Sequence, residues 1–269
     1  MAEGTAKEMG AEGKYMRIIV KIGTNSLMAD GGLNTPIIRS LAKELSSLRS
    51  CGRDVILVTS GAIGSAVEKL GTGFPKDTAT QAAMAAIGQS LLMHEYELAF
   101  AKHGQTIAQI LLTHHNFTNE VSLSNLCSTV EKLFEMSAIP IINENDAVSR
   151  EALSFEKPFS DNDGLAALLC TNFKADLLII LTDVDGVFTQ NPKDFGGAKK
   201  ISGLKNLLAT EVLTAGRSKY GIGGMSSKIN AAKKALEGGA SVAICKAREG
   251  AVLDAAAKNC SGSFFEGGI

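Results

Sequence analysis

The chain alternates between short aliphatic runs and longer stretches with helical spacing, and this alternation limits the fold more than any other feature. Apolar, often β-branched runs predict buried strands at residues 16–22, 55–58, 106–112, 139–142, 176–181 and 241–245. Helical stretches lie between them, at about residues 35–51, 62–70, 80–103, 121–137, 161–173, 224–236 and 251–258. Strands separated by helices predict an α/β/α sandwich with a mainly parallel central sheet.

Local signals place several helix ends. Asn34 followed by Pro36 is typical of an N-cap and first turn, and an N-cap is also expected at Thr118 or Asn119. Gly52 and Gly71 follow helical stretches and predict their C-terminal ends. Residues 147–160 are expected to be irregular or to form a hairpin.

Composition excludes several classes of protein. The chain has 269 residues with 45% hydrophobic and 20% charged residues and a net charge of -1, which predicts a globular protein without a basic face for nucleic acid. Its apolar runs are too short for a membrane span. Five scattered cysteines without a CxxC pair and four histidines without metal spacing favour a reducing, cytoplasmic location and no structural zinc.

Polar and glycine-rich clusters follow the predicted strands, where open parallel sheets bind their ligands. The first is Lys21-Ile22-Gly23-Thr24, in which glycine would admit a phosphate and lysine would neutralise it. A plain glycine turn beside a surface lysine is the alternative, and no Walker A loop occurs. The second is Thr59-Ser60-Gly61, an anion site at a helix N-terminus or simply an N-cap; a nucleophilic Ser60 would lack the GxSxG pattern.

Two acidic clusters come next. Residues 143–146 (Asn-Glu-Asn-Asp) could hold an ammonium group or a metal, or form only a polar turn. Residues 160–164 (Ser-Asp-Asn-Asp-Gly) open a predicted helix, and capping explains only one or two of them. Asp163 could orient nearby lysines through charge-assisted hydrogen bonds.

Two further clusters lie later in the chain. Thr182-Asp183-Val184-Asp185 could be a metal-binding acid pair, as in aspartate-based phosphatases, but that class needs an aspartate where Lys21 stands. Residues 221–228 (GIGGMSSK) could cradle a phosphate with Lys228 as the added cation, or form a surface loop. Together the clusters supply two lysines, several anion sites and a set of acids, which are the parts that phosphoryl transfer needs.

In this order the motifs resemble the amino-acid kinase family, and within it the kinases that act on glutamate. They are VKIGTNSL at 20–27, VTSGAIGSA at 58–66, GQSLL at 88–92, QILLT at 109–113, PIINENDAV at 140–148, SDNDGLAAL at 160–168, LTDVDGVFTQNP at 181–192 and GGMSSK at 223–228. The resemblance covers residues 16 to about 260. PIINENDAV together with DNDGLAAL is the most specific part of it.

The resemblance implies a role for each matched residue. Lys21 and Lys228 would flank the transferred phosphoryl group, and Asp163 would hold both lysines. L-Glutamate would be bound by Ser60, Gly61, Asp146 and Asn162. ATP would be bound by Lys21, Gly23, Thr182, Asp183, Gly223, Gly224, Met225, Ser226, Ser227 and Lys228. Mg²⁺ would sit mainly on the phosphates, with no metal site made of protein side chains. Feedback inhibition by L-proline and a homodimer or homotetramer are further implications.

The chain departs from the resembled pattern in four places. Many bacterial relatives carry a C-terminal PUA domain, so we expect residues 16–269 to form one kinase domain without it. Residues 1–15 are expected to be a flexible leader or an artificial extension. The segment between Asp146 and Asp161 is a few residues longer than usual, and Ile222 stands where threonine is common.

Two alternatives stay open. Another kinase of the family could act on acetylglutamate, aspartate, UMP, carbamate or isopentenyl phosphate, although acceptors that carry phosphate would require more basic residues than Arg150 and Lys157 between residues 143 and 163. A non-catalytic protein that senses proline or glutamate is the second alternative, and the retention of both lysines and Asp163 argues against it.

Overall fold

The computed structural model describes residues 15–29, 32–149, 161–189, 196–201, 203 and 224–268. Its main sheet has seven strands in the order β5-β6-β4-β1-β7-β8-β9. These are β1 (Arg17–Ile22), β4 (Asp54–Val58), β5 (Ile107–Leu112), β6 (Ile139–Glu144), β7 (Leu177–Thr182), β8 (Ser241–Lys246) and β9 (Ser263–Phe265). All neighbouring strands pair in parallel except β8 and β9, which confirms the mainly parallel sheet.

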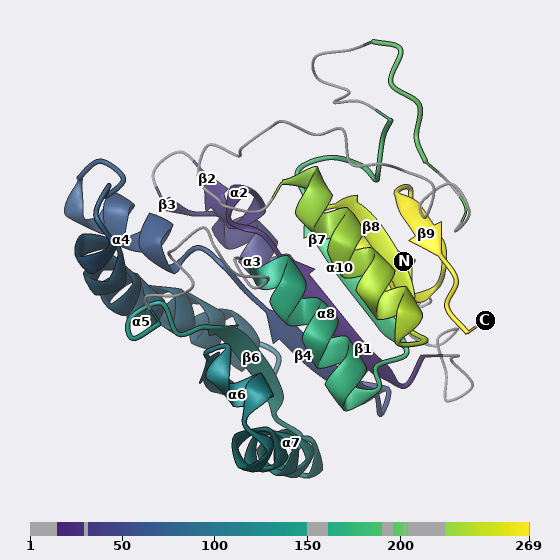
Figure 1. Ribbon diagram of the computed structural model, residues 1–269, viewed down its shortest axis with the longest axis horizontal. Coiled ribbons are helices and arrows are strands. Elements are labelled where there is room, and N and C mark those ends of the chain that lie inside the picture. Colours follow the sequence, from purple (N-terminus) through teal and green to yellow (C-terminus); the bar gives the residue numbers. More distant parts are fainter. Residues whose placement is uncertain are drawn as a thin grey trace.

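Helices cover both faces of this sheet (Figure 1). One face packs against α7 (Glu120–Glu135), α8 (Asn162–Phe173) and α10 (Met225–Glu237). The other face packs against α3 (Thr35–Ser50), α5 (Thr78–Ala101) and α11 (Ala251–Ala256). The nine-residue α4 (Ala62–Leu70) lies along α5, beside the sheet. The predicted α/β/α sandwich is therefore confirmed.

The central strands are buried on both faces, and their packing fixes the position of β1 and of the residues that it carries. Val20, Ile56 and Ile179, from three adjacent strands, are fully buried. Full burial of such a side chain is worth roughly 1.5–3 kcal/mol. Lys21 lies on the same strand as Val20, so the packing of β1 also determines where the lysine backbone sits.

The predicted capping signals are reproduced. Asn34 accepts from the backbone N–H of Ile37 at 3.4 Å, and Asn119 accepts from that of Ser122 at 2.9 Å. Gly71 ends α4 in the left-handed conformation at φ 62°. These side-chain and backbone contacts satisfy groups that a helix end would otherwise leave unpaired.

Several short elements escaped the sequence analysis. They are β9, α2 (Thr24–Leu27), α6 (His115–Thr118) and a hairpin of β2 (Met28–Ala29) with β3 (Gly32–Leu33). Strands of two or three residues show no period in a sequence. β9 depends on Gly262, where a Cβ would lie 2.1 Å from the carbonyl oxygen of Ile244. The leader boundary was also one residue too late, because Tyr15 is buried and its hydroxyl donates to Ser241 Oγ at 3.3 Å.

A buried carboxylate ties α3 to the short α11. Glu44 is 3% exposed. Its Oε1 accepts from the N–H of Gly250 at 3.0 Å, and its Oε2 accepts from the N–H groups of Val252 at 2.8 Å and Leu253 at 3.2 Å. A carboxylate at a helix N-terminus satisfies unpaired donors and faces the positive end of the helix dipole.

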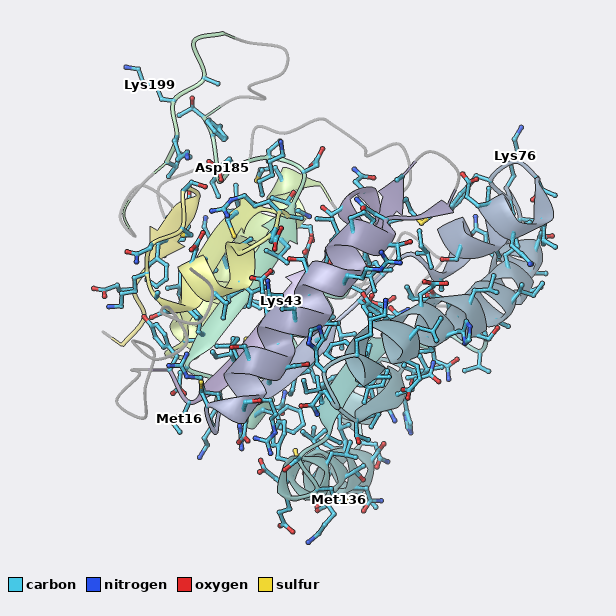
Figure 2. The ribbon with its side chains drawn as sticks, turned by 180° about the vertical axis from the view of Figure 1, so that it is seen from behind. Met16, Lys43, Lys76, Met136, Asp185 and Lys199 are labelled. Atoms are coloured by element: carbon cyan, nitrogen blue, oxygen red, sulfur yellow. The ribbon has the colours of Figure 1, made fainter. Side chains whose placement is uncertain are left out.

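We therefore expect Glu44→Ala to lower the free energy of unfolding by roughly 3 kcal/mol, because it leaves several buried donors without an acceptor. Urea titration measures this loss. The control is Lys43→Ala, whose side chain points outward from α3 (Figure 2) and makes only an exposed 3.5 Å ion pair with Glu249. The control should change stability by less than about 0.5 kcal/mol, and equal losses in both variants would contradict the assignment.

No helix within the described ranges combines the length and the apolarity that crossing a membrane requires.

Candidate active site

The polar clusters meet at the carboxyl end of the parallel strands. Figure 2 places Met16, which precedes β1, and Asp185, which follows β7, at opposite ends of the sheet. Lys21 near the end of β1, Ser60 after β4, Asn143 near the end of β6 and Thr182 at the end of β7 all lie at the Asp185 end. The N-termini of α8 and α10 reach the same end, so residues far apart in the sequence become neighbours.

One buried aspartate binds two buried lysines. Asp163 is fully buried, and its Oδ1 lies 2.7 Å from Lys21 Nζ while its Oδ2 accepts from Lys228 Nζ at 2.9 Å. Asp163 stands in the first turn of α8, where the helix dipole favours a carboxylate. Lys228 comes from the first turns of α10, and the two ammonium groups are therefore held close together in a cluster with an excess of one positive charge.

Burial and the neighbouring charges shift the pKa values of Lys21 and Asp163. Burial lowers the pKa of Lys21 below its ordinary value, and the charge of Lys228 adds to this, while Asp163 opposes both. Burial acts to raise the pKa of Asp163, but the two lysines outweigh it and hold the pKa below its ordinary value. Asp163 is thus ionised at neutral pH, and the cluster suits a group that carries more negative charge than one carboxylate supplies.

A chain of amide hydrogen bonds joins the ends of β4 and β6 to α8. Asn162 Nδ2 donates to Ser60 Oγ at 2.9 Å and to Asn143 Oδ1 at 3.0 Å. Asn143 Nδ2 in turn donates to Gln89 Oε1 of α5 at 2.8 Å. Ser60 is bonded to an amide donor, which can neither take its proton nor activate it, so this arrangement fits a binding role for Ser60 rather than a nucleophilic one.

Ser60 is followed by a backbone conformation that glycine favours. Gly61 has φ 96° and forms the N-cap of α4. A residue with a Cβ would be strained there. The turn therefore points the first N–H groups of α4 toward the sheet end, as expected for an anion site.

Three carboxylates gather beside the lysine cluster. Burial raises the pKa of Glu144 to about 8, and the nearby charges of Asp146 and Asp161 add to the shift, while Lys21 opposes it. Burial also raises the pKa of Asp146 to about 6. Carboxylates held this close stabilise a bound cation, because a cation relieves both their repulsion and their desolvation.

The pKa of Glu144 predicts how stability depends on pH. Its folded-state pKa of about 8 exceeds the ordinary value of 4.5, so the folded state binds more protons than the unfolded state between these limits. Stability should then fall as pH rises from about 4.5 to about 8. We expect Glu144→Gln to melt at a higher temperature than the unchanged protein at pH 8.5, and the difference should shrink toward pH 5.

Differential scanning calorimetry across this pH range measures the effect. Glu97→Gln on the exposed side of α5 is the matched control and should show no pH-dependent gain. Parallel pH profiles for Glu144→Gln and the unchanged protein would contradict the raised pKa.

The residues expected to bind ATP surround the second lysine. Gly224 is the N-cap of α10, and Met225, Ser226 and Ser227 form its first turn. Ser227 Oγ donates to Asp161 Oδ2, which joins the starts of α8 and α10. Thr182 is buried at the end of β7, and its hydroxyl donates to Asp183 at 3.3 Å. Gly223 lies outside the described residues, as do Ser160 and Ile222.

Residues 16–246 match the amino acid kinase family. The chain belongs to the amino acid kinase family. Its resemblance to that family, first apparent from the motifs, thus extends over most of its length.

Curated relatives within this family share one name. The chain is 40% identical to the glutamate 5-kinase of Oenococcus oeni over 83% of this chain and 84% of that protein. It is 38% identical to the glutamate 5-kinase of Ligilactobacillus salivarius over 88% and 90%. The glutamate 5-kinase of Geobacillus kaustophilus is 44% identical over 86% of this chain but only 62% of its own length, so relatives of this amino acid kinase differ in overall length.

A solved structure shares the fold. The product complex of isopentenyl phosphate kinase from T. acidophilum superposes with a TM-score of 0.63, covering 93% of this chain and 100% of that one at 16% identity. At this identity the likeness supports the amino acid kinase fold only.

Some residues of the cluster were not singled out from the sequence. Asn143 and Glu144 end β6; they were grouped with residues 145 and 146 as a possible site for an ammonium group or a metal but given no individual role, and Asp161 was seen only as part of a helix start. Gln89 belongs to the GQSLL motif at 88–92, which supported the resemblance but suggested no role, and nothing in the pattern separates Tyr96 from the other polar residues of the same helix. The burial of Gln89 and Tyr96 becomes visible only in the folded chain, where α5 packs closely against α4.

Proposed function

We propose that this protein transfers the γ-phosphoryl group of ATP to the side-chain carboxylate of L-glutamate and forms L-glutamyl 5-phosphate. The observation that carries the proposal is the Lys21–Asp163–Lys228 cluster, with both lysines within 3 Å of one buried carboxylate. The names of the curated relatives agree with it. In this reaction the protein would carry out the first step of proline biosynthesis.

The chemistry needs charge stabilisation more than proton transfer. A glutamate carboxylate is ionised at pH 7, so its oxygen can attack without a general base. A bond forms from that oxygen to the γ-phosphorus, and the bond from phosphorus to the bridging β–γ oxygen breaks. The electron pair of the broken bond leaves with ADP. Lys21 and Lys228 stabilise the negative charge on the transferring group, and Asp163 holds both ammonium groups in place.

The nucleotide would lie on the β7 and α10 side of this cluster. Thr182 and Asp183 contribute polar groups at the end of β7, and Gly23 admits a phosphate close to Lys21. Residues 223–228 would cradle the phosphates at the N-terminus of α10. Mg²⁺ would arrive on the phosphates of ATP, whose oxygens are the ligands it prefers; among the described residues, no three acidic, His or Cys side chains form a metal site by themselves.

Glutamate would lie on the β4 and β6 side. Asp146, together with the adjacent Glu144 and Asp161, suits its α-ammonium group, since raised carboxylate pKa values mark a place that a cation stabilises. Asn162 donates to Ser60 Oγ at 2.9 Å, and together with Gly61 these two residues would hold the reacting end. The same acids would repel an acceptor that carries its own phosphate, such as UMP or isopentenyl phosphate.

A panel of acceptors tests the proposal. ADP release from Mg-ATP is measured with L-glutamate, N-acetyl-L-glutamate, L-aspartate, UMP, isopentenyl phosphate or no acceptor, and hydroxylamine traps any acyl phosphate. We expect hydroxamate with L-glutamate alone. Turnover only with another acceptor would overturn the substrate, and no turnover with any acceptor would favour a non-catalytic sensor.

Further expectations stay with the proposal. We propose that L-proline inhibits the reaction, that the protein forms a homodimer or homotetramer, that residues 16–269 act as one kinase domain and that the enzyme works in the cytoplasm without nucleic acid or membrane partners. Adding L-proline to the same assay tests the first of these, and light scattering after size-exclusion chromatography tests the second.

A further inference from the structure

Helix α5 contacts residues beside the candidate site at three points. At Gly88 a Cβ would lie 1.7 Å from the carbonyl oxygen of Ala62, so α5 touches the backbone of the first turn of α4. Gln89, the next residue, is buried and bonds Asn143. Tyr96, two turns later on the same side, places its hydroxyl 2.8 Å from Thr59 Oγ1. The helix is thus fixed to the strand ends after β4 and β6 by backbone contact and two buried hydrogen bonds.

The bond from Gln89 determines which way the Asn143 amide faces. Because Gln89 Oε1 accepts from Asn143 Nδ2, Asn143 Oδ1 must face the other way, where it accepts from Asn162 Nδ2 at 3.0 Å and from the N–H of Glu144 at 2.9 Å. Without an acceptor at residue 89, Asn143 Nδ2 would be buried without a partner, and only the Glu144 N–H and Asn162 Nδ2 would still favour this orientation of the amide, since an amide presents a donor on one side and an acceptor on the other.

The orientation passes on to Asn162. Its Nδ2 is used by Asn143 and by Ser60. Its Oδ1 is buried and has no hydrogen-bond partner within the part of the chain that the structure describes. A buried acceptor without a partner is costly, and a ligand that donates a hydrogen bond there would remove that cost.

We propose that Gln89 is a positioning residue for the acceptor substrate. It does not contact the substrate; it orients Asn143, and through Asn143 it turns Asn162 Oδ1 toward a donor of the acceptor, which under the proposed function is the α-ammonium group of L-glutamate. Gln89 therefore governs acceptor affinity and leaves ATP binding and the lysine cluster unaffected.

The test compares two substitutions of glutamine in the same helix. Gln89→Met keeps the length of the side chain and removes its acceptor oxygen. We expect the KM for L-glutamate to rise about tenfold, the equivalent of one lost hydrogen bond, with kcat and the KM for ATP close to those of the unchanged protein and a modest fall in Tm, because Asn143 Nδ2 loses its buried acceptor. The control is Gln81→Met, whose Nε2 donates to Pro75 O at 3.0 Å, remote from this amide chain; it should leave all four quantities unchanged.

A double-mutant cycle shows whether Gln89 acts through Asn143. In an Asn143→Ala background, Gln89→Met should raise the KM for L-glutamate less than twofold, because the residue that it orients is gone. A full tenfold increase in that background, an unchanged KM in the single variant, or parallel changes in kcat, both KM values and Tm would each overturn the proposal.

Failure of the proposed function looks different. In that case neither the unchanged protein nor the Gln89 variant gives hydroxamate with L-glutamate. The double-mutant cycle is then measured with the acceptor that the panel identifies. The same limits apply to the KM for that acceptor: about tenfold for Gln89→Met alone and less than twofold in the Asn143→Ala background.

Discussion

Lys228→Ala is expected to lower kcat by about a thousandfold while the KM for L-glutamate changes by less than threefold. Removing one preorganised charge from a developing transition state typically costs a factor of 10²–10³, and a cation on a transferring phosphoryl group can be worth more. The ammonium group of Lys228 is buried and lies 2.9 Å from Asp163, so water replaces it poorly. The loss should therefore appear in kcat.

The fold should survive this substitution, because Asp163 keeps its 2.7 Å contact with Lys21. Lys234→Ala, on the exposed side of the same helix, is the control for lost helix charge and should keep full activity. Steady-state kinetics with both substrates varied, together with a melting curve, separate these outcomes. A kcat within threefold of the unchanged protein would remove Lys228 from the mechanism.

Asp163→Asn is expected to reduce both activity and stability. The amide leaves two buried ammonium groups without the carboxylate that contacts both of them, and breaking a buried ion pair from one side costs about 3–5 kcal/mol. The lysines would also lose the carboxylate that positions them, so kcat should fall by at least about a thousandfold. Kinetics and urea titration of the same preparation measure both effects.

A second variant and a matched control separate the two effects. Asp163→Asn combined with Lys228→Met removes one of the unpaired charges, so it should recover part of the lost stability and none of the activity. Asp176→Asn alters a carboxylate at the opposite end of the sheet, where its Oδ2 accepts from the N–H groups of Met16 and Arg17 at 2.7 Å each. It should cost stability and leave kcat per folded molecule unchanged, and a similar loss of kcat there would show that Asp163 acts only through the fold.

Long periodic elements could be predicted from the sequence, and short or irregular ones could not. The six aliphatic runs could be recognised as strands because each contains four or more consecutive, mostly apolar residues. β9 and the β2–β3 hairpin contain two or three residues each, and they form only because tertiary contacts bring their partners alongside. Gly262 illustrates this. Only glycine fits there because the carbonyl oxygen of Ile244 in β8, eighteen residues earlier in the chain, would clash with a Cβ.

The sequence predicted those residues of the candidate site that stand in polar or glycine-rich clusters. Lys21, Asp163 and Lys228 each stand in a polar or glycine-rich run at the end of an element, and the sheet rule brings these runs together. The supporting residues were not predictable in this way. Gln89 and Tyr96 acquire their partners from strand ends more than thirty residues away, and the raised pKa of Glu144 depends on Asp161, which approaches it only in the folded chain.

The strand order also divides the sheet into two sides that flank β1. Strands β4, β5 and β6 all lie on one side of β1, and β7, β8 and β9 all lie on the other. Under the proposed function, the acceptor is recognised on the β4 and β6 side and the nucleotide on the β7 and α10 side, with Lys21, Gly23 and α8 at the boundary. Adjacent residues of that helix, Asn162 and Asp163, serve the two sides separately. Exchanging one acceptor for another would therefore require changes at the ends of β4 and β6 and at the start of α8, and would leave the β7 and α10 side unchanged.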